Sequence, residues 1–428
     1  MRIAILTAGS RGDVQPYMAL GSALRRAGHT VTLSALGIFE RRIREAGLGF
    51  APVPDLREFF QRREVQQTHI AFIRNPLMFP AKFLGVIRQA RSLFTDMFTD
   101  LWQASREAEF VIASFMTFAG IDCAAKLNRP ACLTFLQPMS PTVEFPMFFL
   151  PPGLTLGGRC NRLTHILAEK ITWGVGLRSI YNPWRQQTLG FPPLSEYPLA
   201  SFRTACVPTL YAYSPAVLSK PRDWPAWCHV TGYWFLDTPD GFRPPPSLLK
   251  FLDAGPPPVY IGFGSMTAEN PQRLTRIALS ALQMTGQRGI LLSGWAGLSS
   301  ARLPRSVFGL DDIPHDWLFP RMAAAVHHGG AGTTGAGLRA GIPNILTPFM
   351  FDQFGWGRIL PHLGVGPKSI PAQELTAEKL AAAIQTAVTD TAMRERAADI
   401  GRSIRSEDGI ACAIEILQNI SDNHPTRR

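Results

Sequence analysis

Residues 325–353 read AVHHGGAGTTGAGLRAGIPNILTPFMFDQ, and this stretch decides the fold. A short apolar strand at residues 325–327 leads into a glycine-rich turn, and a helix is expected from about Gly335 to Arg339. Glycines let the backbone turn tightly and bring bare N–H groups close to a ligand. The helix adds the positive end of its dipole, so the turn predicts a site for an anion such as a phosphate.

A second buried strand is expected from Asn344 to Thr347, and Asp352 and Gln353 follow shortly after it. A carboxylate and an amide can hold hydroxyl groups through hydrogen bonds. A glycine-rich turn alone also occurs in α/β proteins for purely structural reasons. A phosphate site followed one strand later by this polar pair favours a nucleotide-sugar site.

The N-terminal residues predict a Rossmann-like half of their own. Residues 2–8 are expected to form a buried strand and residues 9–16 a loop. A helix then carries Tyr17, Leu20 and Leu24 on one face, and a second strand begins at His29. The loop lacks the G-x-G-x-x-G spacing, and no acidic residue ends the second strand. The loop therefore does not carry the dinucleotide-binding fingerprint.

Residues 328–334 (HGGAGTT), 341–343 (GIP), Pro348 and 352–353 (DQ) resemble the donor signature of the UDP-glycosyltransferases. On the acceptor side, residues 142–146, 182–185 and 189–193 resemble the sterol glucosyltransferase branch of that family, which also includes bacterial antibiotic glycosyltransferases. The resemblance implies an α/β protein of the GT-B fold, in which two Rossmann-like domains face across a cleft. It places an acceptor-binding domain at residues 1–219 and a donor-binding domain at residues 220–405. A C-terminal helix of about residues 406–420 should cross back to the first domain.

The donor would be held by residues that follow the strands of the second domain. The resemblance implies main-chain contacts to the nucleobase near residues 313 and 315, and phosphate or sugar contacts from two glycine turns and the polar pair. A tryptophan at the end of a strand can also stack on a base, although a core tryptophan is an equally valid interpretation. The expected donor-binding residues are Gly264, Ser265, Trp295, Ile313, His315, His328, Gly330, Gly332, Thr333, Asp352 and Gln353.

Glycosyl transfer also needs a base that takes the proton of the acceptor hydroxyl. Plant members of the family use a histidine in the first loop, but this loop has none. It offers Asp13, as the glycopeptide and sterol branches do, with Ser10 and Arg11 beside it on the acceptor side. An alternative is that Asp13 only caps the first helix. A single attack opposite the leaving group would invert the anomeric centre, as in the family.

No metal or cofactor is expected beyond the UDP-sugar co-substrate. Some glycosyltransferases hold a metal through Asp-x-Asp, and this triplet does not occur here. Helix amides, glycine N–H groups and His328 could stabilise the departing diphosphate instead. The neighbouring His327 is expected to be a core histidine.

Composition limits the other function classes. Of the 428 residues, 46% are hydrophobic and 18% are charged, which is typical of a globular protein. Six scattered cysteines argue for a reducing compartment and against a zinc site or a disulfide framework. No signal peptide or membrane-spanning run is evident, so a cytoplasmic location is expected.

The formal net charge of +11 comes mostly from dispersed arginines, and no nucleic-acid motif accompanies it. Peripheral contact with the inner face of a membrane is the favoured interpretation. A helical pattern between residues 70 and 102 spaces Phe79, Phe83 and Ile87, and then Phe94, Met97, Phe98 and Leu101, at three- and four-residue intervals. These residues predict core packing, and some of them could line an apolar acceptor pocket or touch a membrane.

The sequence therefore predicts transfer of a hexose, glucose from UDP-glucose, to a hydroxyl of a sterol, triterpenoid or other lipid. One alternative is a natural-product enzyme that moves a TDP-deoxysugar to a macrolide, glycopeptide or polyketide. Another is a Rossmann oxidoreductase or nucleotide-sugar epimerase, because residues 330–335 spell G-x-G-x-x-G between a strand and a helix. No acid ends the next strand and no Tyr-x-x-x-Lys pair occurs, which argues against this second alternative. A non-catalytic nucleotide-sugar binder would have no need for Asp13.

Overall fold

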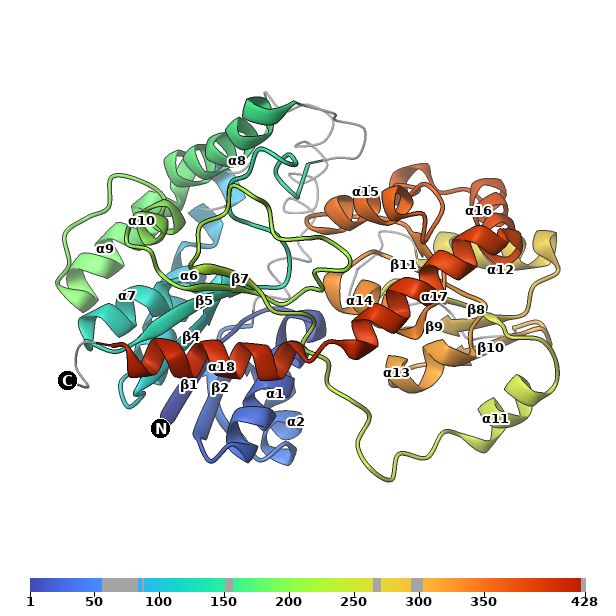
Figure 1. Ribbon diagram of the computed structural model, residues 1–428, viewed down its shortest axis with the longest axis horizontal. Coiled ribbons are helices and arrows are strands. Elements are labelled where there is room, and N and C mark those ends of the chain that lie inside the picture. The colour runs from blue at the N-terminus through green and yellow to red at the C-terminus, as the bar shows by residue number, and fades with distance from the viewer. Residues whose placement is uncertain (56–83, 87, 151–156, 265–270, 294–302, 425–428) are drawn as a thin grey trace.

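The computed structural model describes residues 1–55, 84–86, 88–150, 157–264, 271–293 and 303–424. Two parallel sheets, each flanked by helices, form two α/β domains side by side (Figure 1). This confirms the predicted fold class. The expected residues Phe79, Phe83, Ile87, Ser265 and Trp295 lie outside the described residues.

The first sheet has seven strands in the order β3-β2-β1-β4-β5-β6-β7, all parallel. Strands buried on both faces are near-continuous apolar runs, as in the fully buried β4. The strands are β1 (Arg2–Leu6), β2 (Thr30–Leu36), β3 (Gly49–Val53), β4 (Phe110–Ser114), β5 (Ala131–Phe135), β6 (Thr209–Tyr211) and β7 (Cys228–Val230).

The last strand of this sheet corrects one expectation. The donor-binding domain was expected to begin at residue 220. Instead β7 pairs with β6, Leu210 opposite His229, so the first sheet extends to Val230. Three residues are too few to show a periodic pattern, which is why the sequence gives no sign of this strand.

The helices of the first domain flank its sheet. They are α1 (Arg11–Arg26), α2 (Glu40–Glu45), α6 (Arg91–Ser105), α7 (Ala119–Lys126), α8 (Gly158–Thr172), α9 (Arg178–Leu189) and α10 (Pro198–Thr204). In α6 the predicted core residues Met97, Phe98 and Leu101 are fully buried. Helix α1 begins at Arg11, within the stretch expected to be a loop.

The second sheet has the order β10-β9-β8-β11-β12, also parallel. Its strands are β8 (Val259–Gly262), β9 (Gly289–Leu292), β10 (Val307–Leu310), β11 (Ala324–His327) and β12 (Asn344–Leu346). Its helices are α11 (Pro246–Asp253), α12 (Pro271–Thr285), α13 (His315–Leu318), α14 (Ala331–Ala340), α15 (Gln353–Leu363), α16 (Ala377–Thr389) and α17 (Thr391–Ser406). The carboxyl ends of β8 and β11 are neighbours, and ligands bind at this edge in open α/β sheets.

Helix α18 (Gly409–Asp422) returns from the second domain and lies along the first (Figure 1). It contacts α1, and Ser421 lies 3.2 Å from the sulfur of Met1. Just before α18, Glu407 accepts a 2.6 Å hydrogen bond from the Ser214 hydroxyl. These contacts confirm the predicted crossing of the C-terminal helix.

A close contact at Gly355 joins α15 of the second domain to the loop that follows β5 of the first. The Phe148 ring packs edge-on against Trp356, with centroids 5.0 Å apart. A Cβ atom added at Gly355 would lie 2.2 Å from Phe148 Cδ1. Only glycine allows the ring this close to the helix.

We expect Gly355→Ala to lower the free energy of unfolding by about 1–3 kcal/mol, because the interface must shift to admit the methyl group. Chemical denaturation measures the loss. Gly174→Ala is the matched control, since a Cβ there meets nothing within 4 Å and should change stability by less than about 1 kcal/mol. Equal stability of the Gly355 variant and the parent would contradict this interface.

Candidate active site

The N-terminus of α14 opens the donor side of the site. The helix begins at Ala331, with Gly330 as its N-cap, and not at Gly335 as the sequence suggested. Gly332 and Thr333 therefore lie in its first turn, where backbone N–H groups have no partner within the helix. A Cβ at Gly332 would meet nothing within 4 Å. The turn thus presents main-chain donors to open space, as an anion site requires.

His328 is wedged between two glycines beside this turn. A Cβ at Gly264 would lie 2.7 Å from His328 Cε1, and one at Gly330 would lie 2.6 Å from Nε2. Any side chain at either position would displace the ring. Burial, with His327 and His315 acting in the same direction, lowers the pKa of His328 to about 3. The imidazole is therefore neutral near pH 7 and can donate one N–H.

The two adjacent histidines have different partners. His327 is fully buried, its Nε2 lies 2.9 Å from Asn344 Oδ1, and its Nδ1 accepts from the Gly329 N–H at 3.1 Å. His327 is therefore a core residue that ties β11 to β12, as expected. By contrast, His328 Nδ1 has no hydrogen-bond partner among the residues that the structure describes. Buried polar atoms are normally satisfied, and this atom is one of nine in the described residues that are not.

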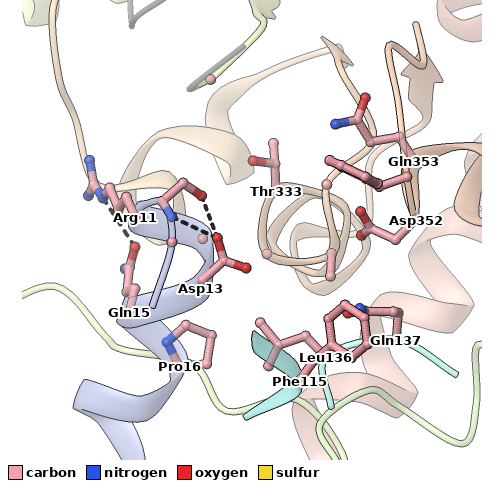
Figure 2. Close-up of a pocket in the computed structure, with 18 of the residues that line it drawn as sticks. Arg11, Asp13, Gln15, Pro16, Phe115, Leu136, Gln137, Thr333, Asp352 and Gln353 are labelled. Atoms are coloured by element: carbon pink, nitrogen blue, oxygen red, sulfur yellow. Dashed lines mark hydrogen bonds between the residues drawn. The ribbon is translucent and has the colours of Figure 1, made fainter. Parts of the chain in front are cut away.

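Asp13 lies in the first turn of α1, and its contacts correct the alternative prediction that it caps this helix. One carboxylate oxygen, Oδ2, accepts from the Ser10 backbone N–H at 2.7 Å and the Ser10 hydroxyl at 2.9 Å. The N-cap is Ser10, so Asp13 completes a capping box and is not the cap itself. Figure 2 shows the other oxygen directed into the pocket. Burial raises the pKa of Asp13, although the two bonds from Ser10 oppose this.

Gly9 makes room for this carboxylate. Its φ of +130° is unfavourable for other residues, and a Cβ there would lie 2.5 Å from Asp13 Oδ2. The first loop therefore holds the carboxylate in one place. This constraint by Gly9 was not predicted from the sequence, and the role of Asp13 stays a prediction.

Asp352 faces Asp13 from the other side of the pocket (Figure 2). Its Oδ2 accepts a 3.2 Å hydrogen bond from Trp356 Nε1, one helical turn along α15. Burial and then the negative charge of Asp13 raise the pKa of Asp352 to about 7. The two domains therefore bring the Asp13 carboxylate close enough to raise the pKa of Asp352.

The side-chain oxygen of Gln353 accepts from the backbone N–H groups of Phe349 and Met350, at 2.8 and 3.1 Å. This oxygen holds the end of the preceding loop, which the sequence did not indicate. The side chain is buried at the wall of the pocket. Its predicted contact with a sugar hydroxyl stays a prediction.

One cleft of about 1720 Å³ collects nearly all of these residues. Both domains line it, and the site residues on its surface are Ser10, Arg11, Asp13, Gly264, His315, His328, Gly330, Gly332, Thr333, Asp352 and Gln353. Ile313 is different, because its side chain is buried in the core of the second domain. Only its main chain could serve the predicted nucleobase contact.

Near His315 the cleft is crossed by ion pairs that the sequence did not predict. Asp312 of the second domain pairs with Arg11, and also with Arg42 at 3.0 Å, both from the first domain. Burial alone would raise the pKa of Asp312, but the two arginines outweigh it and lower the pKa. Arg11 was placed on the acceptor side, whereas its guanidinium bonds to the donor domain. His315 itself stacks on Phe319, with centroids 4.4 Å apart.

The first-domain part of the cleft is apolar. Its walls include Phe115, Phe118, Leu136, Met139, Met147 and Phe149. The predicted core residue Phe94 also lines it, so part of that helical pattern does face the pocket. Such walls suit a hydrophobic ligand.

The loop that carries Met147 and Phe149 is fastened to α15. Arg358 donates to the backbone carbonyls of Leu150 and, at 3.2 Å, Phe148. Burial lowers the pKa of Arg358 to about 10, so it stays charged at neutral pH. Hence the helix that starts at Gln353 on the donor side also fixes the acceptor-side loop.

In the described part of the chain, no group of three or more His, Cys, Asp or Glu side chains is arranged to hold a metal ion. All six cysteines are free thiols.

The raised pKa of Asp352 predicts how stability depends on pH. The folded protein keeps this proton up to about pH 7, whereas an unfolded chain releases it near pH 4. Between these values the folded state binds more protons, so its free energy of unfolding falls as the pH rises. Asp352→Asn should therefore be more stable than the parent above about pH 7, by about 1–4 kcal/mol, with no difference below about pH 4. Urea denaturation across this range measures it, and a gain that does not change with pH would contradict the assignment.

Comparison with known proteins agrees with this architecture. Residues 3–128 match the glycosyltransferase family 28 N-terminal domain, and residues 291–420 match the C-terminal domain of erythromycin biosynthesis protein CIII-like proteins. The sterol 3-beta-glucosyltransferase of Pichia angusta is 37% identical over 98% of this chain and 33% of its own length. That of Aspergillus terreus is 37% identical over 97% of this chain and 30% of its own length. The chain thus spans about a third of the length of these curated relatives.

Solved structures share the fold at lower identity. The calicheamicin glycosyltransferase CalG4 matches with a TM-score of 0.70 and 18% identity, covering 99% of each chain. The glycosyltransferase of kitacinnamycin matches with a TM-score of 0.71 and 17% identity, covering 98% of this chain and 99% of its own. These two-domain structures confirm the GT-B fold. The chain therefore carries a glycosyltransferase family 28 N-terminal domain and an EryCIII-like C-terminal domain in a GT-B fold.

Proposed function

We propose that this chain is an inverting, metal-independent glycosyltransferase that moves glucose from UDP-glucose to a hydroxyl of an apolar acceptor, a sterol in the first instance. The observation that carries the proposal is the shared cleft. It joins Asp13 and apolar walls from the first domain to the α14 amides, His328, Asp352 and Gln353 from the second. The relatives at 37% identity are sterol 3-beta-glucosyltransferases, which supports a sterol acceptor.

In this reaction Asp13 takes the proton of the acceptor hydroxyl, and the oxygen attacks the anomeric carbon as the bond to the diphosphate breaks. The oxygen of Asp13 that faces the pocket is the one not engaged by Ser10. A raised pKa makes Asp13 a stronger base than an ordinary aspartate. Attack opposite the leaving group inverts the anomeric centre.

The departing diphosphate gains negative charge, which the N-terminus of α14 and the neutral His328 stabilise as hydrogen-bond donors. Donors that are positioned before the reaction stabilise the developing charge without a cost of reorganisation. Asp352 accepts from sugar hydroxyls on the far side of the ring. Since Trp356 holds one of its oxygens, the carboxylate is oriented for this task.

The alternative donor is a TDP-deoxysugar, with a macrolide or peptide acceptor. Two similar folds are described with thymidine diphosphate, the glycosyltransferases VinC and SsfS6. Their identities of 18% and 16% establish the fold alone. The far higher identity to sterol 3-beta-glucosyltransferases favours UDP-glucose.

A direct test offers UDP-glucose and TDP-sugars to sterols and other hydroxylated lipids, with products read by mass and by NMR at the anomeric carbon. We expect a β-linked sterol glucoside from the α-linked donor UDP-glucose. Products formed only from TDP-sugars, or retention of the α-configuration, would contradict the proposal.

The role of Asp13 is tested by Asp13→Asn, whose amide oxygen can still accept from Ser10 and preserve the capping box. Turnover should fall by about 10²–10⁴-fold while the affinity for UDP-glucose, measured by calorimetry, changes little. Asp390→Asn is the matched control, because Asp390 also accepts from a first-turn amide, that of Met393, but does not line the cleft. If Asp13→Asn turns over like this control, Asp13 only stabilises the helix.

A further inference from the structure

Helix α8 has an outer face whose apolar side chains are left exposed in the described structure. Among the residues that the structure describes, Leu163 and Leu167 are the most and third most exposed large apolar side chains, at 60% and 52% of their surface. Arg159, Arg162 and Lys170 of the same helix are also exposed, and Ile166 is half-buried. At 3.6 residues per turn, these six positions share one face.

This face carries more positive than negative charge, since Asp223 pairs with Arg162 alone, at 3.8 Å, and no acid of α8 itself lies on the face. The only acidic residue of α8 is Glu169. It lies at the margin of the face and is engaged by Arg203 through two hydrogen bonds of 2.6 and 2.7 Å. The outer face therefore combines three aliphatic side chains with three cations, of which Arg162 lies 3.8 Å from the Asp223 carboxylate, on a molecule whose formal net charge is +11.

The opposite face of α8 belongs to the active-site cleft. Thr164, His165, Ala168, Ile171 and Thr172 line the acceptor part of it. His165 is buried, with Nε2 3.1 Å from the Phe145 carbonyl. The helix is thus a single wall between the cleft and the outside, and Figure 1 shows it at the edge of the first domain.

We propose that the outer face of α8 docks on a lipid bilayer that contains anionic lipids, which places the acceptor part of the cleft beside the membrane. Aliphatic side chains flanked by arginine and lysine are typical of helices that lie in the bilayer interface. Cations near the surface are attracted to anionic headgroups. A second copy of this chain is a poorer partner, because a symmetric contact would set three cations against three.

The contact would be peripheral. None of the helices in the described ranges is both long and apolar enough to pass through a bilayer. Only the biological reason for membrane docking rests on the proposed function, because sterols are found in bilayers. The membrane binding itself follows from the outer face of α8.

Vesicle flotation with the whole chain tests the docking, using phosphatidylcholine vesicles with and without phosphatidylserine. The triple variant Arg159→Gln, Arg162→Gln, Lys170→Gln should bind phosphatidylserine vesicles on the order of a hundredfold more weakly. The double variant Leu163→Gln, Leu167→Gln should bind them roughly tenfold more weakly. All of these side chains are exposed, so thermal unfolding should hardly change.

The matched control is Leu249→Gln with Met284→Gln. These side chains are 40% and 58% exposed on α11 and α12 of the second domain. This variant should bind vesicles like the parent. Absence of vesicle binding by the parent, or equal loss in the control and the α8 variants, would overturn the proposal. So would a parent dimer, seen by analytical ultracentrifugation, that the α8 variants abolish.

Donor binding separates this proposal from the proposed function. Both α8 variants should keep the parent's affinity for UDP-glucose, because α8 contributes no predicted donor residue. If vesicles are bound through α8 but no lipid is glucosylated, the surface stands and the proposed function fails. If glucosylation of a detergent-dispersed sterol proceeds while neither vesicle type is bound, the function stands and the surface assignment fails.

Discussion

The structure depends on one electrostatic arrangement, the N-terminal turn of α14 directed into the cleft between the domains. The backbone N–H groups of the first helical turn have fixed positions and do not titrate. They therefore give a constant positive potential at the start of the helix. Gly330 caps the helix, and His328 fits beside it only because Gly264 and Gly330 lack side chains. The rest of the second domain holds this turn in place, down to the buried His327–Asn344 bond between β11 and β12.

The second constraint is that the reacting groups come from different domains. Asp13 belongs to α1 and Asp352 to the start of α15, yet the charge of Asp13 contributes to the raised pKa of Asp352. The Asp312 ion pairs with Arg11 and Arg42 and the Phe148–Trp356 packing hold the domains at this separation. Helix α15 connects these parts of the structure. Gln353 binds the loop at the donor wall, Gly355 packs against Phe148 at the domain interface, and Arg358 binds the acceptor-side loop.

Local pattern predicted the sheets and the glycine turn, because each follows from residue types at short spacing. It also named Asp13, His328 and Asp352, which line one cleft in the structure, and their roles stay predictions. It placed the start of α14 four residues late, since Gly and Thr in the first turn have low helix propensity and no apolar period. The Asp352–Trp356 bond could have been found, as its four-residue spacing fits one helical turn. The Arg358 and Arg11 contacts could not, because they join segments about 200 and 300 residues apart.

The central claim is that amides and a neutral imidazole, and not a bound cation, let the nucleoside diphosphate depart. The most direct measurement is the turnover rate of the parent and of His328→Ala with UDP-glucose and a sterol, in the presence of EDTA. The account predicts that EDTA leaves the parent's rate unchanged and that His328→Ala lowers it by about 10²–10³-fold. A rate that EDTA abolishes and manganese restores, or a His328→Ala enzyme as fast as the parent, would contradict it.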